Sequence, residues 1–193
     1  VEAGNERLVV EESTERISLD QVLQHARKHN RPLPENVFLN IAAQICNGLE
    51  ALHGRPGRGT GAENVLHLGL RPAACWVDSE GKVLLGDCSL VRSPLSLPGA
   101  ASGSLGIQLE YLSPEQTHSA QKLTPASDVF SLGTLLFELF TLTPLFAGET
   151  GEITIQQVRR ADVTSQLLKV KERLPGLDKI LFRALAVNPR HRY

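Results

Sequence analysis

The segment between residues 54 and 61 is the first whose composition suggests chemistry, because GRPGRGTG contains four glycines and a proline. A glycine-rich loop binds phosphate when its backbone N–H groups lie between a strand and the start of a helix. Here the segment follows a predicted helix, leads toward a strand and lacks the GK[ST] ending. We therefore interpret it as a surface loop and not as a phosphate-binding loop.

Other reactive side chains are scattered along the chain. The cysteines Cys46, Cys75 and Cys88 lack the spacing of a zinc site or a redox motif. Free thiols are typical of a reducing compartment, so we expect a cytoplasmic protein. His67 stands in a mostly apolar segment, where a lone histidine is more often a satisfied core residue than a general base.

Composition narrows the class of protein. The 193 residues, 41% of them hydrophobic and 21% charged, predict one folded unit. A formal net charge of -1 with scattered basic residues excludes a phosphate-neutralising surface, so we expect no nucleic-acid partner. No apolar run approaches the roughly 20 residues that cross a bilayer, so we expect no membrane partner for this segment. Because the sequence begins at Val1 and contains no methionine, we expect a piece of a longer chain.

Apolar residues recur every three or four positions over most of the chain, which predicts helices. Ser18 is a candidate N-cap for one helix, and Pro34 is a good first-turn residue for the next. The run 127–142 is apolar nearly all round, which indicates a helix buried in the middle of the domain. The expected helices span 18–30, 34–53, 127–142, 154–160, 163–171 and 177–187.

Strands are expected in two places. The β-branched run 7–12 predicts one or two strands at the start, and 75–77 with 82–85 predict a hairpin around a turn at 78–81. Residues 93–106 are rich in Ser, Pro, Gly and Ala and predict a long irregular loop. The sequence therefore predicts a mainly α fold with a small β element.

This order of parts resembles the C-lobe of the Ser/Thr protein kinases, particularly their bacterial members, from Leu8 to Arg192. VLHLGLRPAACWVD resembles the catalytic loop, and KVLLGDCSLVR resembles the segment that carries D-F-G. Four further motifs agree in order: LVVEE with the hinge strand, EYLSPEQ with A-P-E, DVFSLG with the start of the central helix, and NPRHR with a late arginine motif.

The resemblance implies a protein-kinase-like C-lobe with a small β-hairpin and one or two N-lobe strands at its start. Residues 1–16 would be a remnant of the N-lobe strands and the hinge, with Glu11 as the hinge residue near a nucleotide. Residues 17–193 would form the C-lobe, without the last helix of the family.

The resemblance also shows departures at the positions that do chemistry. Kinases use a base aspartate, and an asparagine and a second aspartate that hold Mg²⁺. Gly69 stands at the base position and Ala74 at the asparagine position, while Arg71 replaces the loop lysine and keeps its positive charge. Asp87 is retained and is the candidate for a residual Mg²⁺ site, although a turn or helix-cap role explains it equally well. The Gly-Thr pair of the family is replaced by Ile107 and Gln108.

Other family positions are kept and imply structural roles. Glu115 and Arg192 would form a buried ion pair, which mainly fixes the fold. Asp128 would either cap its helix or, as in the family, hold the backbone of the catalytic loop.

We therefore predict a catalytically impaired domain, a pseudokinase, that binds a protein partner or regulates signalling. We expect no catalytic residue in the loop and no resident cofactor. The alternative is a divergent Ser/Thr kinase that binds ATP and Mg²⁺ or transfers phosphoryl groups when joined to an upstream N-lobe. For protein binding we expect the loop 93–106 and the neighbouring helical surface to form the platform.

Overall fold

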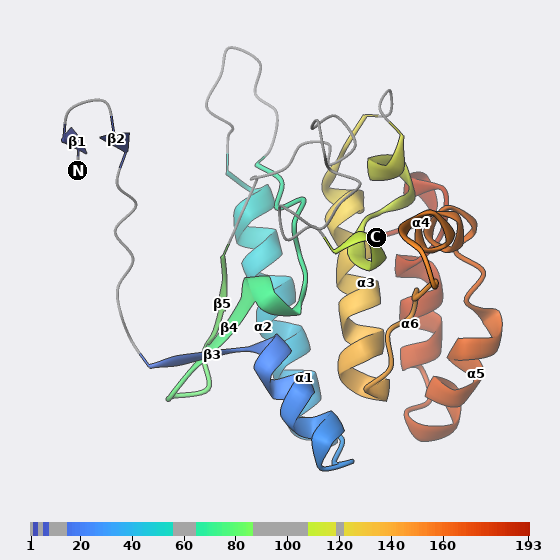
Figure 1. Cartoon of the computed structure of the whole chain (residues 1–193), viewed down its shortest axis with the longest axis horizontal. Coiled ribbons are helices and arrows are strands. Elements are labelled where there is room, and N and C mark those ends of the chain that lie inside the picture. Colours follow the sequence, from blue (N-terminus) through green and yellow to red (C-terminus); the bar gives the residue numbers. More distant parts are fainter. Residues whose placement is uncertain (1, 4–5, 8–14, 56–64, 87–107, 119–121) are drawn as a thin grey trace.

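The computed structural model describes residues 2–3, 6–7, 15–55, 65–86, 108–118 and 122–193 (Figure 1). Helices dominate these ranges, which confirms the predicted mainly α fold. The helices are α1 (Leu19–Lys28), α2 (Glu35–His53), α3 (Pro125–Thr141), α4 (Gly151–Arg160), α5 (Thr164–Arg173) and α6 (Leu177–Ala184). Single 3₁₀ turns are η1 (Pro72–Ala74), η3 (Leu109–Tyr111), η4 (Pro114–Thr117) and η5 (Pro189–His191). The strands are β1 (Glu2–Ala3), β2 (Glu6–Arg7), β3 (Arg16–Ser18), β4 (Cys75–Asp78) and β5 (Val83–Leu85).

Helix α1 begins at a capping box. The backbone N–H of Gln21 donates to Ser18 Oγ at 3.2 Å, and the N–H of Ser18 donates to Gln21 Oε1 at 2.9 Å. These bonds satisfy N–H groups that have no partner inside the helix, which is why Ser18 starts it. The apolar positions Leu19, Leu23 and Ala26 are buried.

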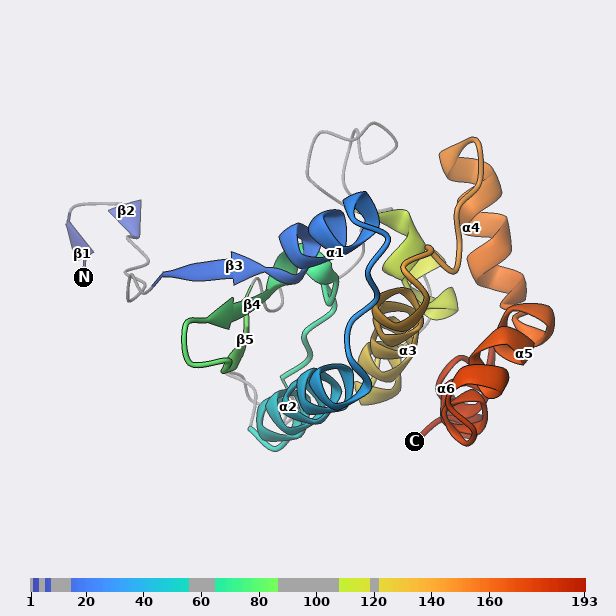
Figure 2. The same ribbon diagram turned by 90° about the horizontal axis from the view of Figure 1, so that it is seen from below.

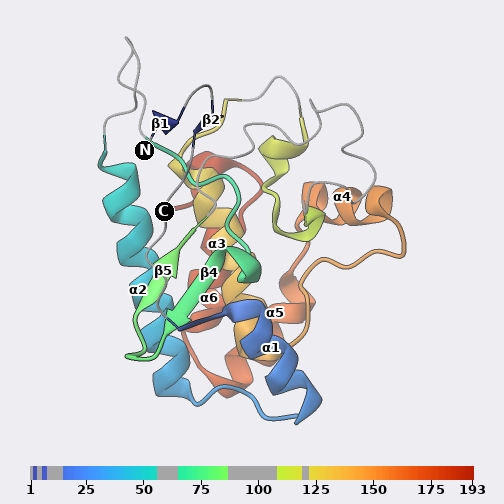
Figure 3. The ribbon, with the colours of Figure 1, turned by 60° about the vertical axis from the view of Figure 1, so that its left-hand side comes forward.

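The strands β3, β4 and β5 form an antiparallel sheet in that order, beside α2 (Figure 3). The turn between β4 and β5 is closed by Asp78, whose Oδ1 accepts from the N–H groups of Glu80 (3.0 Å) and Lys82 (2.9 Å). Gly81 adopts φ 79°, which glycine does at little cost. The predicted hairpin is therefore confirmed.

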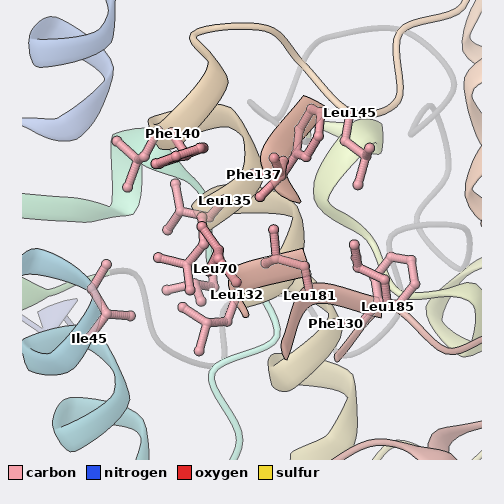
Figure 4. Close-up of a cluster of buried hydrophobic side chains, with 14 of the residues drawn as sticks. Ile45, Leu70, Phe130, Leu132, Leu135, Phe137, Phe140, Leu145, Leu181 and Leu185 are labelled. Carbon is pink, nitrogen blue, oxygen red and sulfur yellow. The ribbon is translucent and has the colours of Figure 1, made fainter. Parts of the chain in front are cut away.

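Helix α3 is the centre of the core, with α2 on one side and α6 on the other (Figures 1 and 2). Its side chains are buried nearly all round, and Phe130, Leu135 and Leu139 have no exposed surface. Figure 4 shows Phe130 and Leu135 within the cluster of buried apolar side chains. Helices α3 and α6 pack closely at Gly133, where an added Cβ would lie 3.2 Å from the Cβ of Ala184 and 3.1 Å from the side chain of Leu185. The prediction of a buried central helix is confirmed.

Some boundaries differ from those predicted. Helix α4 begins three residues before the expected 154, because Thr150 caps it and accepts from the N–H of Ile153 at 3.3 Å. Helix α6 ends at Ala184 and not at 187, and the chain then turns toward η5. Of the strand predicted at 7–12, only Arg7 is described, and it ends β2; the rest of that strand, most of the glycine-rich loop and the whole of 93–106 lie outside the described residues. No helix in the described ranges is both long and apolar enough to span a membrane.

Candidate functional site

The loop 65–74 connects α2 to β4 and passes the first turn of α3 (Figure 3). The carboxylate of Asp128 accepts hydrogen bonds from the backbone N–H groups of His67 at 2.8 Å and Leu68 at 2.7 Å. Asp128 has no exposed surface, so these donors replace the water that it has lost. Asp128 was expected either to cap its helix or to hold the backbone of the loop. In the structure it holds the loop, and Thr124 caps α3.

Leu68 has a left-handed backbone, with φ 56°. This conformation crowds the Cβ of any residue other than glycine and needs support from the surroundings. The N–H of Leu68 is held by Asp128, and its carbonyl oxygen accepts from Gln116 Nε2 at 3.0 Å. Gln116 is itself fixed, because its Oε1 accepts from the N–H of Ser113 at 2.9 Å. Side chains of α3 and η4 therefore hydrogen-bond to both backbone polar groups of the strained residue, its N–H and its carbonyl oxygen.

Two histidines lie around the same carboxylate. His53, the last residue of α2, places Nε2 2.7 Å from Asp128 Oδ2. His67 has no exposed surface, and its Nδ1 accepts from the N–H of Gly69 at 3.3 Å. Both rings therefore contact groups that shape the loop.

Gly69, Arg71 and Ala74 lie at positions where the kinase resemblance places catalytic groups. Arg71 Nη1 donates to the carbonyl oxygen of Gly69 at 3.1 Å, so its guanidinium folds back on the loop. Ala74 is fully buried, and its carbonyl oxygen accepts from the N–H of Gly86 at 2.8 Å. This hydrogen bond joins η1 to the residue that follows β5.

The side chains of the loop 65–74 contain no oxygen that could bind a metal ion. Mg²⁺ prefers carboxylate and amide oxygens, and neither Gly69 nor Ala74 supplies one. Within the described ranges, no three His, Cys, Asp or Glu residues lie close enough together to hold a metal ion. Asp87 and Glu11 lie outside the described residues. Of the two expected metal positions, the described one, Ala74, therefore supplies no side-chain oxygen.

Gln108 occupies the position where the resemblance places a threonine that contacts the base. It is half-buried, and its Oε1 has no hydrogen-bond partner among the described residues. Its predicted neighbour in this pair, Ile107, lies outside those residues.

Glu115 and Arg192 form a buried ion pair between η4 and the end of the chain. Arg192 Nη1 lies 2.7 Å from Glu115 Oε1, and Nη2 lies 3.0 Å from Oε2, in a bidentate arrangement. Ser127 Oγ also donates to Glu115 at 2.7 Å, and the guanidinium stacks 4.9 Å from the ring centre of Phe130. Burial raises the pKa of Glu115, but hydrogen bonds from Arg192 and Ser127 outweigh it and hold that pKa below its usual value.

A second buried network was missed by the sequence reasoning. Tyr111 Oη and Arg27 Nη2 both donate to the carboxylate of Glu138, and Arg27 Nε donates to the carbonyl oxygen of Leu142 at 2.8 Å. Burial, together with the charge of Glu138, raises the pKa of Tyr111 far above its usual value. The network ties α1 and η3 to α3. The residue that could have predicted this network is Glu138, because a buried carboxylate on a mostly apolar helix needs a partner.

The described lobe is thus mainly α, with the loop 65–74 held by Asp128 of the central helix and with a buried pair between Glu115 and Arg192. The family model described as the protein kinase domain matches residues 1–193. The chain therefore belongs to the protein kinase family, with Ser/Thr kinases as its relatives.

Three relatives show the extent of the similarity. The serine/threonine-protein kinase srb10 of Schizosaccharomyces pombe is 32% identical over 166 residues, covering 79% of this chain and 42% of the relative. SSN3 of Chaetomium globosum is 33% identical over 149 residues, covering 75% and 27%. PknL of Mycobacterium tuberculosis is 30% identical over 162 residues, covering 84% and 38%. The matched part is less than half the length of each relative.

Proposed function

We propose that this chain is a catalytically impaired protein-kinase-like domain, a pseudokinase, that acts as a protein-binding or regulatory signalling module. The observation that carries the proposal is Gly69 at the position of the catalytic base. A glycine has no side chain that can accept or orient the proton of an attacking hydroxyl.

The rest of the loop supports the same proposal. No carboxylate occurs anywhere between Val65 and Ala74, so no neighbouring residue of the loop substitutes for the base. Ala74 removes one of the two side chains that hold the metal ions, and its methyl group is fully buried. Loss at two positions with separate roles is harder to compensate than loss at one.

The scaffold around the loop is intact by contrast. Asp128 holds the loop backbone, Gln116 holds Leu68, and Glu115 pairs with Arg192. A lobe with a kept shape and missing chemical groups is suited to presenting a surface to another protein. The proposal also assigns residues 1–16 to a remnant of the N-lobe strands and the hinge, and residues 17–193 to the C-lobe. It places the chain in the cytoplasm.

The second candidate is a divergent Ser/Thr kinase joined to an upstream N-lobe. It is favoured by Asp87, which keeps one metal-binding carboxylate in the sequence, and by relatives that are named as kinases. In that case ATP and Mg²⁺ would bind near Asp87, with the hinge around Glu11 against the nucleotide.

Thermal unfolding of the full chain with ATP, with and without Mg²⁺, tests nucleotide binding. We expect no Mg²⁺-dependent rise in the melting temperature. A rise that Asp87→Ala removes would support the second candidate, because a ligand stabilises the state that binds it. Transfer of labelled phosphate, described at the end of the Discussion, tests the catalytic impairment itself.

A further inference from the structure

A groove of about 280 Å³ lies between α5 and α6. The buried Leu167 is among the residues that line it, together with Leu168 and Phe182, which are 58% and 61% exposed. Leaving two large apolar side chains in water costs free energy that burial in a partner would recover.

These side chains are not needed by the core of the lobe. Helix α5 is anchored to it through Leu167 and Val170, and α6 through Leu177 and Leu181, all of them buried. The two helices lie side by side at the edge of the molecule opposite the three-stranded sheet (Figures 1 and 2). Ile180, 50% exposed, adds to the apolar surface of α6.

The charged residues in the lining of the groove are two lysines and one aspartate. Lys171 and Lys179 line the groove itself, and both are exposed. The one carboxylate in the lining, Asp178, is engaged locally, because its Oδ1 accepts from the N–H of Gly176 at 3.0 Å.

We propose that the α5–α6 groove binds an amphipathic helix of a partner protein, with apolar anchors on one face flanked by acidic residues. The inference rests on the proposed role of the lobe as a protein-binding module and names the surface and the partner chemistry. The anchors pack between Leu168 and Phe182, as in helix-in-groove recognition. The acidic residues of the partner lie beside Lys171 and Lys179. This opposite charge speeds association and disfavours basic helices.

The test is fluorescence anisotropy with a labelled peptide of about 18 residues, with leucine or phenylalanine at positions i, i+3, i+4 and i+7 and glutamate beside them. We expect saturable binding to the full chain that weakens as salt is added. A scrambled peptide of the same composition and a peptide with lysine for glutamate are expected to bind at least about tenfold more weakly.

Variants of the protein locate the binding. Phe182→Glu and Leu168→Glu are each expected to weaken binding of the peptide by about tenfold or more. Leu39→Glu is the matched control, because Leu39 is 46% exposed on α2 and is expected to leave binding unchanged. Lys171→Glu with Lys179→Glu changes only exposed charges, so it tests the groove even where an apolar variant fails to fold. This double variant is expected to prefer the lysine-bearing peptide.

Any of the following results would overturn the proposal. They are no saturable binding, equal binding of the scrambled peptide, binding that the groove variants do not change, and capture of phosphatidylserine vesicles in place of the peptide. Self-association that Phe182→Glu abolishes would assign the groove to a second copy of the chain instead. None of these results bears on phosphoryl transfer, so the proposed loss of catalysis is tested separately from the binding proposal.

Discussion

Asp128 and Leu68 are joined by a 2.7 Å hydrogen bond across 60 residues of sequence, and Leu68 is the residue of the loop with left-handed backbone. The bond supports a strained backbone conformation from a carboxylate that has no exposed surface. Asp128 therefore holds the backbone of the loop at the residue directly before Gly69.

The first prediction concerns this bond. Asp128→Ala leaves the N–H groups of His67 and Leu68 buried without their acceptor, and each such group costs about 1–3 kcal/mol. We expect the free energy of unfolding, measured with urea, to fall by about 3 kcal/mol or more. Asp162→Ala is the control, because Asp162 is exposed and its removal is expected to leave the stability nearly unchanged. Equal stability of the two variants would contradict a supporting role for Asp128.

The second prediction concerns Glu115 and pH. Because the folded state lowers the pKa of Glu115, its stabilising effect is present above the unfolded pKa of about 4.3 and is lost as the pH falls through the folded pKa. Glu115→Gln breaks a buried pair from one side and is expected to cost about 3–5 kcal/mol at neutral pH. The difference from wild type should shrink in acid.

Denaturant titrations of both proteins over a range of pH measure this difference. Glu172→Gln, at an exposed position on α5, is the matched control and should show no such convergence. A gap that stays constant down to the acid transition would show that the charge of Glu115 is not what stabilises the pair.

The third prediction concerns Tyr111. Burial and the neighbouring carboxylate of Glu138 keep its hydroxyl protonated, so Tyr111 should not ionise while the protein stays folded in alkali. The chain has two tyrosines, Tyr111 and Tyr193. Phenolate absorbance of folded protein should therefore be the same for wild type and for Tyr111→Phe. A titration amplitude that falls by about half in Tyr111→Phe would show that Tyr111 ionises in the folded state.

The elements that follow from local chemistry could be predicted from the sequence. Ser18 caps α1, the apolar run of α3 is buried, and Gly81 closes the hairpin, since each depends on a few neighbouring residues. The start of α4 was missed because the polar Thr150, outside the apolar pattern, fixes it.

The site was harder to predict because its contacts join distant residues. Sequence alone left two roles open for Asp128, since only the folded chain brings the N–H of Leu68 to it. Gln116 and His53 are common residue types whose roles depend entirely on where α2 and η4 pack against the loop. That Gly69 and Ala74 carry no side-chain oxygen follows from the residue types alone and needs no geometry.

Transfer of labelled γ-phosphate from ATP, in the presence of Mg²⁺, to the chain itself and to a generic protein substrate tests the central claim most directly. We predict no transfer above that of an Asp87→Ala variant prepared in parallel, because the proposal places Gly69 at the base position and Ala74 at the position of one metal ligand. Transfer by the wild-type chain that Asp87→Ala abolishes would contradict the account and identify a working kinase.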